Sequence, residues 1–239
     1  MAMTDKEFLN VIVQSFEKFL LTGSRSNEKL KILHSSIAKD VLERINDKSY
    51  NVYSLGLGES QEKIIKGRYI DKKVDITIIK NGIIKAGIGV KFVMQNYSQN
   101  SNNYFENMLG ETANIRSNST PYFQIFIIPD TLPYYDNGGN LQKWEQFTKH
   151  NVKKYLALSE DNIETSIHTP TLTLLYVLHL PEPTQEIRNK KDYIEYYSTL
   201  RKFNIEKSIQ DYGTFSNSVV FNDYDSFADR LCHYIKFTG

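Results

Sequence analysis

The sequence predicts a mixed α/β (α+β) fold in which one central β-sheet carries helices on both faces. Apolar residues recur at helical spacing over residues 5–21 and 27–46. Two strand-like segments then meet at an Asn-Gly within residues 72–94, and a helical segment at 98–117 precedes an almost continuous apolar run at 122–128. A tight hairpin pairs its strands antiparallel, whereas a helical crossover returns the chain parallel, so the sheet should be mixed.

The other predicted elements follow from the same periodicities. Residues 51–60 are typical of strand or loop, residues 62–69 of a strand, and residues 170–180 of another buried strand. Helices are expected at 141–158, at 184–211 with a possible interruption, and at 223–237. With no repeat, low-complexity tract or obvious linker, we expect one domain spanning 1–239.

Composition narrows the class of protein. The 29 Lys and Arg residues are balanced by 28 Asp and Glu, which excludes a bulk-basic nucleic-acid binder but allows a local basic cleft. The lone Cys232 excludes an internal disulfide framework and fits a reducing, cytoplasmic setting. We find no signal-peptide core and no apolar run long enough to cross a membrane, so no membrane partner is expected. The five histidines, for which we expect structural or surface roles, show no metal-ligand spacing: His34, His150, His168, His179 and His233.

The strand-like segments around Asn81-Gly82 each carry one unexpected charge, Asp75 and Lys91. Their apolar residues are even-numbered on both segments, and paired residues share a face of a sheet, so paired numbers must have an even sum. We therefore expect a three-residue loop, residues 80–82, with Gly82 in the left-handed conformation of a G1 bulge. Asp75 and Lys91 would then share one face.

This face also contains Gly87 and Gly89, which leave part of it bare. Glycine inside a strand often marks close approach of a ligand or another backbone. The simpler interpretation is a solvated hairpin face on which Asp75 and Lys91 are ordinary surface charges.

The arrangement resembles the PD-(D/E)XK nuclease superfamily, which includes many type II restriction endonucleases. Asp75 matches the first acid of that family, and Gly89-Val90-Lys91 lies where its (D/E)-x-K triplet is expected, with Lys91 as the lysine. The resemblance covers about residues 28–130 and implies a restriction-endonuclease-like αβββαβ core, with 131–239 as helical and strand additions.

The chain departs from that family at Gly89, where an acid is expected. Some members carry this acid on the following helix, and Glu106 stands fifteen residues after Lys91. Gly89 would leave room for such a side chain. Glu106 shares a helical stripe with Gln99, Asn103 and Gly110, while Glu111 falls on another stripe and is the competing candidate. We favour Glu106.

The resemblance implies a Mg²⁺-dependent endonuclease acting on double-stranded DNA, with Mn²⁺ as a substitute and a homodimer as the assembly. Asp75, Glu106 and the Val90 carbonyl would bind the metal, and Lys91 would act in catalysis. Glu62 or Glu59 could bind a second metal ion or orient water, but the simpler interpretation places both at the surface, at the start of a helix or strand. Candidate DNA contacts are Lys73, Arg68, Tyr97, Asn102, Asn103 and Arg116.

Two other functions remain open on the sequence. A DNA-binding protein could retain the nuclease fold after losing catalysis at Gly89. An interaction protein that does not bind nucleic acid would also suit the balanced net charge.

Overall fold

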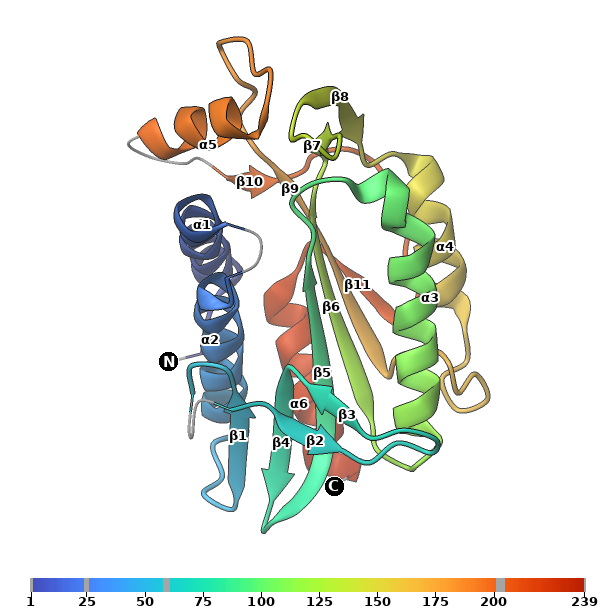
Figure 1. Ribbon diagram of the computed structural model, residues 1–239. Coiled ribbons are helices and arrows are strands. Elements are labelled where there is room, and N and C mark those ends of the chain that lie inside the picture. The colour runs from blue at the N-terminus through green and yellow to red at the C-terminus, as the bar shows by residue number, and fades with distance from the viewer. Residues whose placement is uncertain (1, 24–25, 58–60, 201–204, 239) are drawn as a thin grey trace.

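A seven-stranded mixed sheet organises the residues that the computed structural model describes, 2–23, 26–57, 61–200 and 205–238. Its order is β1-β4-β5-β6-β9-β10, with β11 beside β9 (Figure 1). The strands are β1 (Tyr50–Ser54), β4 (Ile76–Lys80), β5 (Ile83–Phe92), β6 (Tyr122–Pro129), β9 (Leu172–His179), β10 (Glu206–Lys207) and β11 (Val219–Phe221). Two small hairpins lie outside it: β2 (Lys63–Ile65) with β3 (Lys72–Val74), and β7 (Thr131–Tyr135) with β8 (Leu141–Gln146).

The prediction of a mixed sheet is confirmed. Strands β1, β4 and β5 pair antiparallel, whereas β5, β6, β9 and β11 pair parallel. The change of direction occurs at β5, because a tight turn leads into this strand and a helical crossover leaves it. β5 is therefore the strand shared by the antiparallel and parallel halves.

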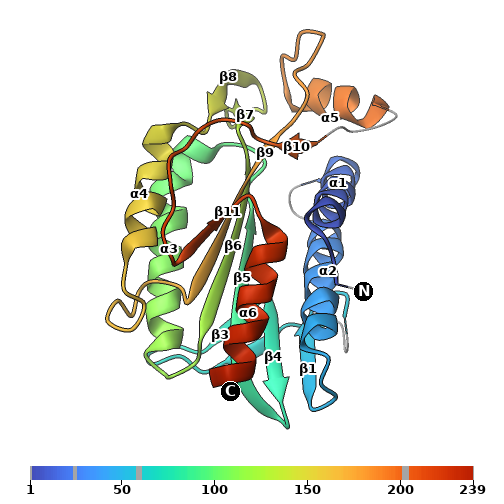
Figure 2. The same ribbon diagram turned by 180° about the vertical axis from the view of Figure 1, so that it is seen from behind.

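Helices cover both faces of the sheet, as expected (Figures 1 and 2). The even-numbered apolar residues of β4 and β5 pack with one set of helices, and the opposite face of β6 and β9 packs with the other. The first set comprises α1 (Asp5–Thr22), α2 (Glu28–Ile45), α5 (Lys190–Thr199) and α6 (Tyr224–Thr238), and the second comprises α3 (Tyr97–Arg116) and α4 (Lys149–Glu160).

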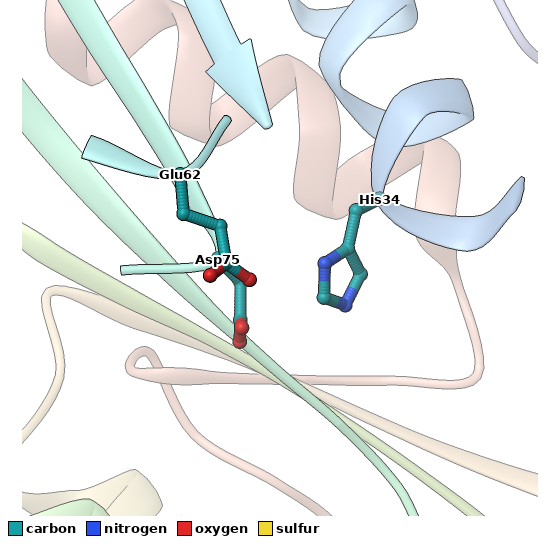
Figure 3. A group of neighbouring side chains, drawn as sticks. All are labelled: His34, Glu62 and Asp75. Carbon is teal, nitrogen blue, oxygen red and sulfur yellow. The ribbon is translucent and has the colours of Figure 1, made fainter. Parts of the chain in front are cut away.

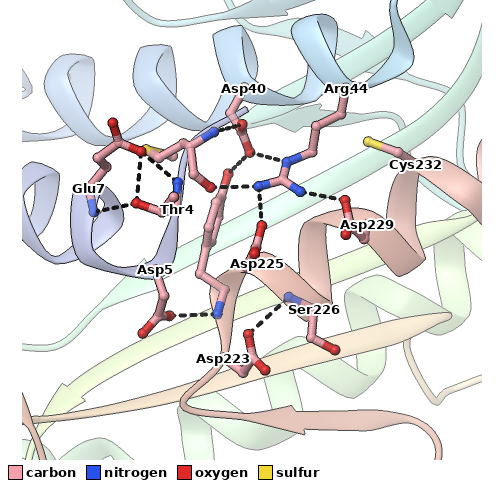
Figure 4. Close-up of polar contacts among 12 residues, drawn as sticks. Thr4, Asp5, Glu7, Asp40, Arg44, Asp223, Asp225, Ser226, Asp229 and Cys232 are labelled. Atoms are coloured by element: carbon pink, nitrogen blue, oxygen red, sulfur yellow. Dashed lines mark hydrogen bonds and ion pairs between the residues drawn. The ribbon is translucent and has the colours of Figure 1, made fainter. Parts of the chain in front are cut away.

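A buried arginine fastens the first helical layer. The Arg44 side chain, 5% exposed, donates to Asp40 at 2.9 Å within α2 and to Asp225 at 2.7 Å on α6, and it also bonds Asp229 (Figure 4). Its second terminal nitrogen donates to the Met3 carbonyl at 2.6 Å. A buried charge needs such partners, and these connect the start of the chain, α2 and α6.

The loop between β4 and β5 differs from our prediction. It contains two residues, Asn81 and Gly82, both with positive φ, and Lys80 pairs with Ile83. That is the geometry of a type I′ turn. The extra residue lies instead inside β5: Ile79 pairs with Ile84 but Ile78 pairs with Ala86, so Lys85 forms a bulge. The bulge restores the even sums that the apolar pattern requires.

Several boundaries were also wrong. The predicted helix 141–158 is β8 followed by α4, because residues 141–146 pair with β7 and Thr148 then begins a helix with a capping box. Within the predicted helix 184–211, the described residues form one short helix, α5, which starts at the N-cap Asn189, and the short strand β10. The predicted strand 62–69 is only three residues long.

Candidate functional site

Asp75 lies in a bend between β3 and β4, where the chain passes from the small hairpin into the main sheet. The last β4–β5 pair is Ile76 with Ile88. Val90, two residues further along β5, donates its backbone N–H to the Asp75 carboxylate at 2.7 Å. The carboxylate therefore occupies the position that the next backbone acceptor of an uninterrupted β4 would take.

Asp75 belongs to a group with His34 and Glu62, whose ligand atoms all lie within 4.8 Å of one another. Figure 3 shows the three side chains converging from α2, from the residue preceding β2, and from the bend before β4. His34 is fully buried, and among the described residues neither of its ring nitrogens has a hydrogen-bond partner. Burial lowers the pKa of His34 to about 4, so its imidazole is neutral at neutral pH.

The chemistry of this group suits a divalent cation. Burial raises the pKa of Asp75 to about 6, the Val90 N–H and Lys91 lower it, and the charge of Glu62 raises it. Two neighbouring carboxylates and a buried neutral imidazole provide oxygen and nitrogen ligands together. A cation would supply the missing partner for His34 and offset the charge of both acids, so these residues can hold a metal ion.

Lys91 and Asp75 line the same cleft of about 360 Å³, in agreement with the predicted common face. The Lys91 ammonium lies 4.4 Å from the centre of the Tyr104 ring. Partial burial lowers the pKa of Lys91, and the Asp75 carboxylate raises it. The Lys91 side chain also remains accessible to solvent.

The bare position at Gly89 is filled by side chains from β6. A Cβ at Gly89 would lie 2.4 Å from the Tyr122 hydroxyl oxygen and 2.8 Å from Gln124 Oε1. Gln124 is the β6 residue that pairs with Gly89, whereas Tyr122 pairs with Gly87, and its hydroxyl reaches along the strand to Gly89. At Gly87, the same hypothetical atom would lie 2.7 Å from a methyl group of Ile65. The close approach that the two glycines permit is therefore made by side chains of the protein.

Glu111, rather than Glu106, lines the cleft. Its carboxylate lies near the Tyr122 hydroxyl, and burial raises its pKa while Lys72 and the Tyr122 hydroxyl lower it. Tyr104, Asn107, Met108 and Glu111 all line the cleft from α3, at spacings of three and four residues. Glu106 is out of phase with that stripe, so our preference for it is corrected: it is exposed and its charge acts on Lys154.

Two of the predicted DNA contacts have structural roles instead. Tyr97 is 1% exposed, within the core beneath α3. Arg116 donates to the backbone carbonyls of Ile163, Ser166 and Thr169, and so anchors the segment before β9.

The other predicted contacts lie at the surface. Asn102 and Asn103 are exposed on α3, and Arg68 is exposed in the β2–β3 loop. Lys73 is exposed and pairs with Glu62 at 3.2 Å. Val90, whose carbonyl was predicted to bind the metal, lines the cleft and donates its backbone N–H to Asp75. Glu59 lies outside the described residues.

His34 is the residue that sequence reasoning missed. The spacing of the histidines could not indicate this site, because the other two members of the group, Glu62 and Asp75, are acids. The available signal was its place on the buried stripe of α2 with Ala38 and Val41. A titratable side chain on an otherwise apolar stripe requires a partner.

Among the described residues, no helix has the length and apolar character needed to span a membrane. Comparison with known proteins found no family model, curated protein or solved structure that matches this chain.

Proposed function

We propose that this protein hydrolyses phosphodiester bonds of DNA in a reaction that depends on a divalent metal ion. The observation that carries the proposal is the position of Asp75. Its carboxylate lies within 4.8 Å of ligand atoms of His34 and Glu62, and it lines one cleft together with Lys91. A metal-binding carboxylate beside an ammonium group is suited to a substrate that is itself anionic.

The ligand set favours Mn²⁺ over the Mg²⁺ implied by the sequence resemblance. Mg²⁺ prefers oxygen ligands, whereas an imidazole nitrogen suits transition metals. His34 would bind through one ring nitrogen, and Asp75 and Glu62 through carboxylate oxygens. When bound, such an ion neutralises charge on a phosphate and lowers the pKa of a water molecule.

Lys91 would act on the phosphate group. Its ammonium is positioned by the Tyr104 ring, 4.4 Å away, at the wall of the cleft. A fixed positive charge there stabilises the additional negative charge of a pentacovalent phosphate transition state.

Glu111 would supply the acid that is absent at Gly89. The Tyr122 hydroxyl fills the space over Gly89 and interacts with Glu111, so the carboxylate enters the cleft from the helix rather than from the strand. The negative charges of Glu111 and Asp75 act on each other, and each raises the pKa of the Tyr122 hydroxyl. This arrangement favours an active enzyme over a DNA-binding protein that has lost catalysis.

The finer proposal is a type II restriction endonuclease that cuts double-stranded DNA as a homodimer. It is supported by the mixed sheet, by the position of Asp75 immediately before β4 and by the position of Lys91 on β5. A symmetric dimer would present two equivalent clefts to the two strands of a duplex.

The test is cleavage of a mixture of plasmid and phage DNA with Mn²⁺ or Mg²⁺, compared between the wild type and the Asp75→Asn and Lys91→Met variants. We expect both substitutions to abolish cleavage. Glu106→Gln is the control. Glu106 is an acid on α3 that lies outside the cleft, so this variant should cut like the wild type. Equal cleavage by all four proteins would refute the proposal.

A further inference from the structure

The β2–β3 hairpin, residues 63–74, presents an exposed apolar pair beside the cleft. Tyr69 is 81% exposed and Ile70 is 62% exposed, both in the loop that joins the two strands. Ile64, on the outer side of β2, is 61% exposed. Large apolar side chains gathered in this way on one small element mark a surface that contacts another molecule.

The loop is held in place by Asn114 of α3, which is 7% exposed. Its amide oxygen accepts from the backbone N–H groups of Tyr69 at 2.9 Å and Ile70 at 3.2 Å, and its amide nitrogen donates to the Ile70 carbonyl at 2.7 Å. Gly67 makes this contact possible, because a Cβ there would lie 2.0 Å from the Asn114 amide nitrogen. The exposed pair is therefore displayed by a fixed loop.

The inner side of the hairpin is packed against the sheet. Ile65 and Val74 are each 1% exposed and form a small core with Ile115 and Tyr122. Asp75 follows Val74 directly, so the hairpin and the metal-binding carboxylate are joined without a flexible connection. The position of the hairpin relative to the cleft is consequently fixed.

The hairpin is basic although the whole chain is almost neutral. Within residues 63–73 only Asp71 is acidic, whereas five residues are cationic: Lys63, Lys66, Arg68, Lys72 and Lys73. Lys66 and Arg68 are exposed in the loop beside Tyr69. Lys72 and Lys73 line the cleft.

We infer that this hairpin binds the sugar–phosphate backbone of duplex DNA with its cations and inserts Tyr69 and Ile70 against the base pairs. Apolar wedges of this kind enter the minor groove and partly unstack a base step, while adjacent Lys and Arg side chains contact the phosphates. The inference deepens the proposed function and rests on it for the choice of DNA as partner. It explains why apolar and basic side chains occur together on one rigid element next to the cleft.

The test measures binding instead of cleavage. A short fluorescein-labelled DNA duplex is titrated in EDTA with the full-length wild type and with Tyr69→Ala, Ile70→Ala and the combined variant. We expect the combined variant to bind at least about tenfold more weakly. Ile209→Ala is the matched control, since Ile209 is 99% exposed outside the hairpin, and it should bind like the wild type.

Salt dependence separates the two kinds of contact. Replacing Lys66 and Arg68 with alanine should reduce the slope of log K against log salt by about two, whereas Tyr69→Ala should leave the slope unchanged. Lys153→Ala, which removes an exposed cation on α4, should alter neither quantity. Because Tyr69 is exposed in the folded protein, its variant is expected to fold normally, and circular dichroism checks this.

A duplex containing 2-aminopurine reports unstacking by an increase in fluorescence, which Tyr69→Ala should lose. Unchanged duplex affinity in the combined variant would overturn the inference, as would hairpin-dependent binding to single strands alone. Hairpin-dependent duplex binding without cleavage would overturn the proposed hydrolysis and leave this inference standing.

Discussion

The carboxylate of Asp75 accepts a hydrogen bond from the backbone N–H of Val90 at 2.7 Å, at the point where β4 stops pairing with β5. This contact fixes the direction of the Asp75 carboxylate. A carboxylate has two oxygens, so one can accept an N–H while the other contacts a cation. The end of a strand pair thus becomes a defined position for a carboxylate that can bind a cation.

Asp75→Asn should stabilise the metal-free protein at neutral and alkaline pH. The pKa of Asp75 is raised to about 6 from its usual 3.8, so the folded state favours the protonated carboxyl. Stability is therefore lost as pH rises through this window, and an amide avoids the loss while still accepting the Val90 N–H. We expect a gain of about 1–3 kcal/mol in unfolding free energy near pH 8 and no gain below about pH 4.

Urea denaturation in EDTA at the two pH values measures this difference. If the variant and the wild type were equally stable at both pH values, or if the variant were less stable near pH 8, the assigned environment of Asp75 would be contradicted. An exposed acid gives a useful comparison: Glu106→Gln should change stability little at either pH.

Metal should stabilise the wild type through His34. At about a hundredfold excess over its dissociation constant, a ligand of the native state adds about 2.7 kcal/mol. For a chain of this size, that corresponds to a rise in melting temperature of roughly 5–10 °C. His34→Leu should retain a cooperative transition without metal, since it removes an imidazole whose nitrogens have no partner among the described residues, but should lose the rise with Mn²⁺.

Scanning calorimetry with Mn²⁺ and with EDTA checks this. An equal rise in the wild type and in His34→Leu would place the metal elsewhere. His150→Leu, which removes an exposed histidine at the start of α4, should keep the full metal-dependent rise.

Gly89→Ala should destabilise the protein by about 1–3 kcal/mol, because the new methyl group would lie 2.4 Å from the Tyr122 hydroxyl oxygen. Tyr122→Phe removes that oxygen. The double variant should therefore recover part of the loss, and a double-mutant cycle on urea denaturation measures the coupling. Strictly additive effects would show that the hydroxyl does not limit the space at Gly89.

Glu111→Gln should reduce the rate of DNA cleavage by about 10–100-fold, a range typical when a partner of a metal site is removed. Glu106→Gln should have no effect, because this side chain lies outside the cleft. Initial rates at saturating Mn²⁺ provide the comparison. If Glu106→Gln cut more slowly than Glu111→Gln, Glu106 would be the acid of the site, and the orientation of α3 described here would be contradicted.

The alternation of apolar residues was sufficient to predict the common face of Asp75 and Lys91, because only one parity buries both strands. It could not locate the extra residue. A G1 bulge at the loop and a bulge at Lys85 give the same parity further along the strands, and the Asn-Gly pair suits a two-residue turn.

The remaining site residues depend on tertiary packing. Glu106 and Glu111 are separated on α3 by a rotation about the helix axis, and the sequence alone did not determine which stripe faces the cleft. His34, which we propose as a ligand, comes from α2, at a distance in sequence that no spacing rule covers. The packing of α2 and α3 onto the sheet determines both the position of His34 and which glutamate of α3 faces the cleft.

The central claim is that a divalent cation binds at Asp75. The most direct measurement is an anomalous difference map from a crystal of the wild-type protein grown with Mn²⁺. We predict one peak in contact with a ring nitrogen of His34 and with carboxylate oxygens of Glu62 and Asp75. At saturating Mn²⁺, no peak within coordination distance of Asp75 would contradict the account.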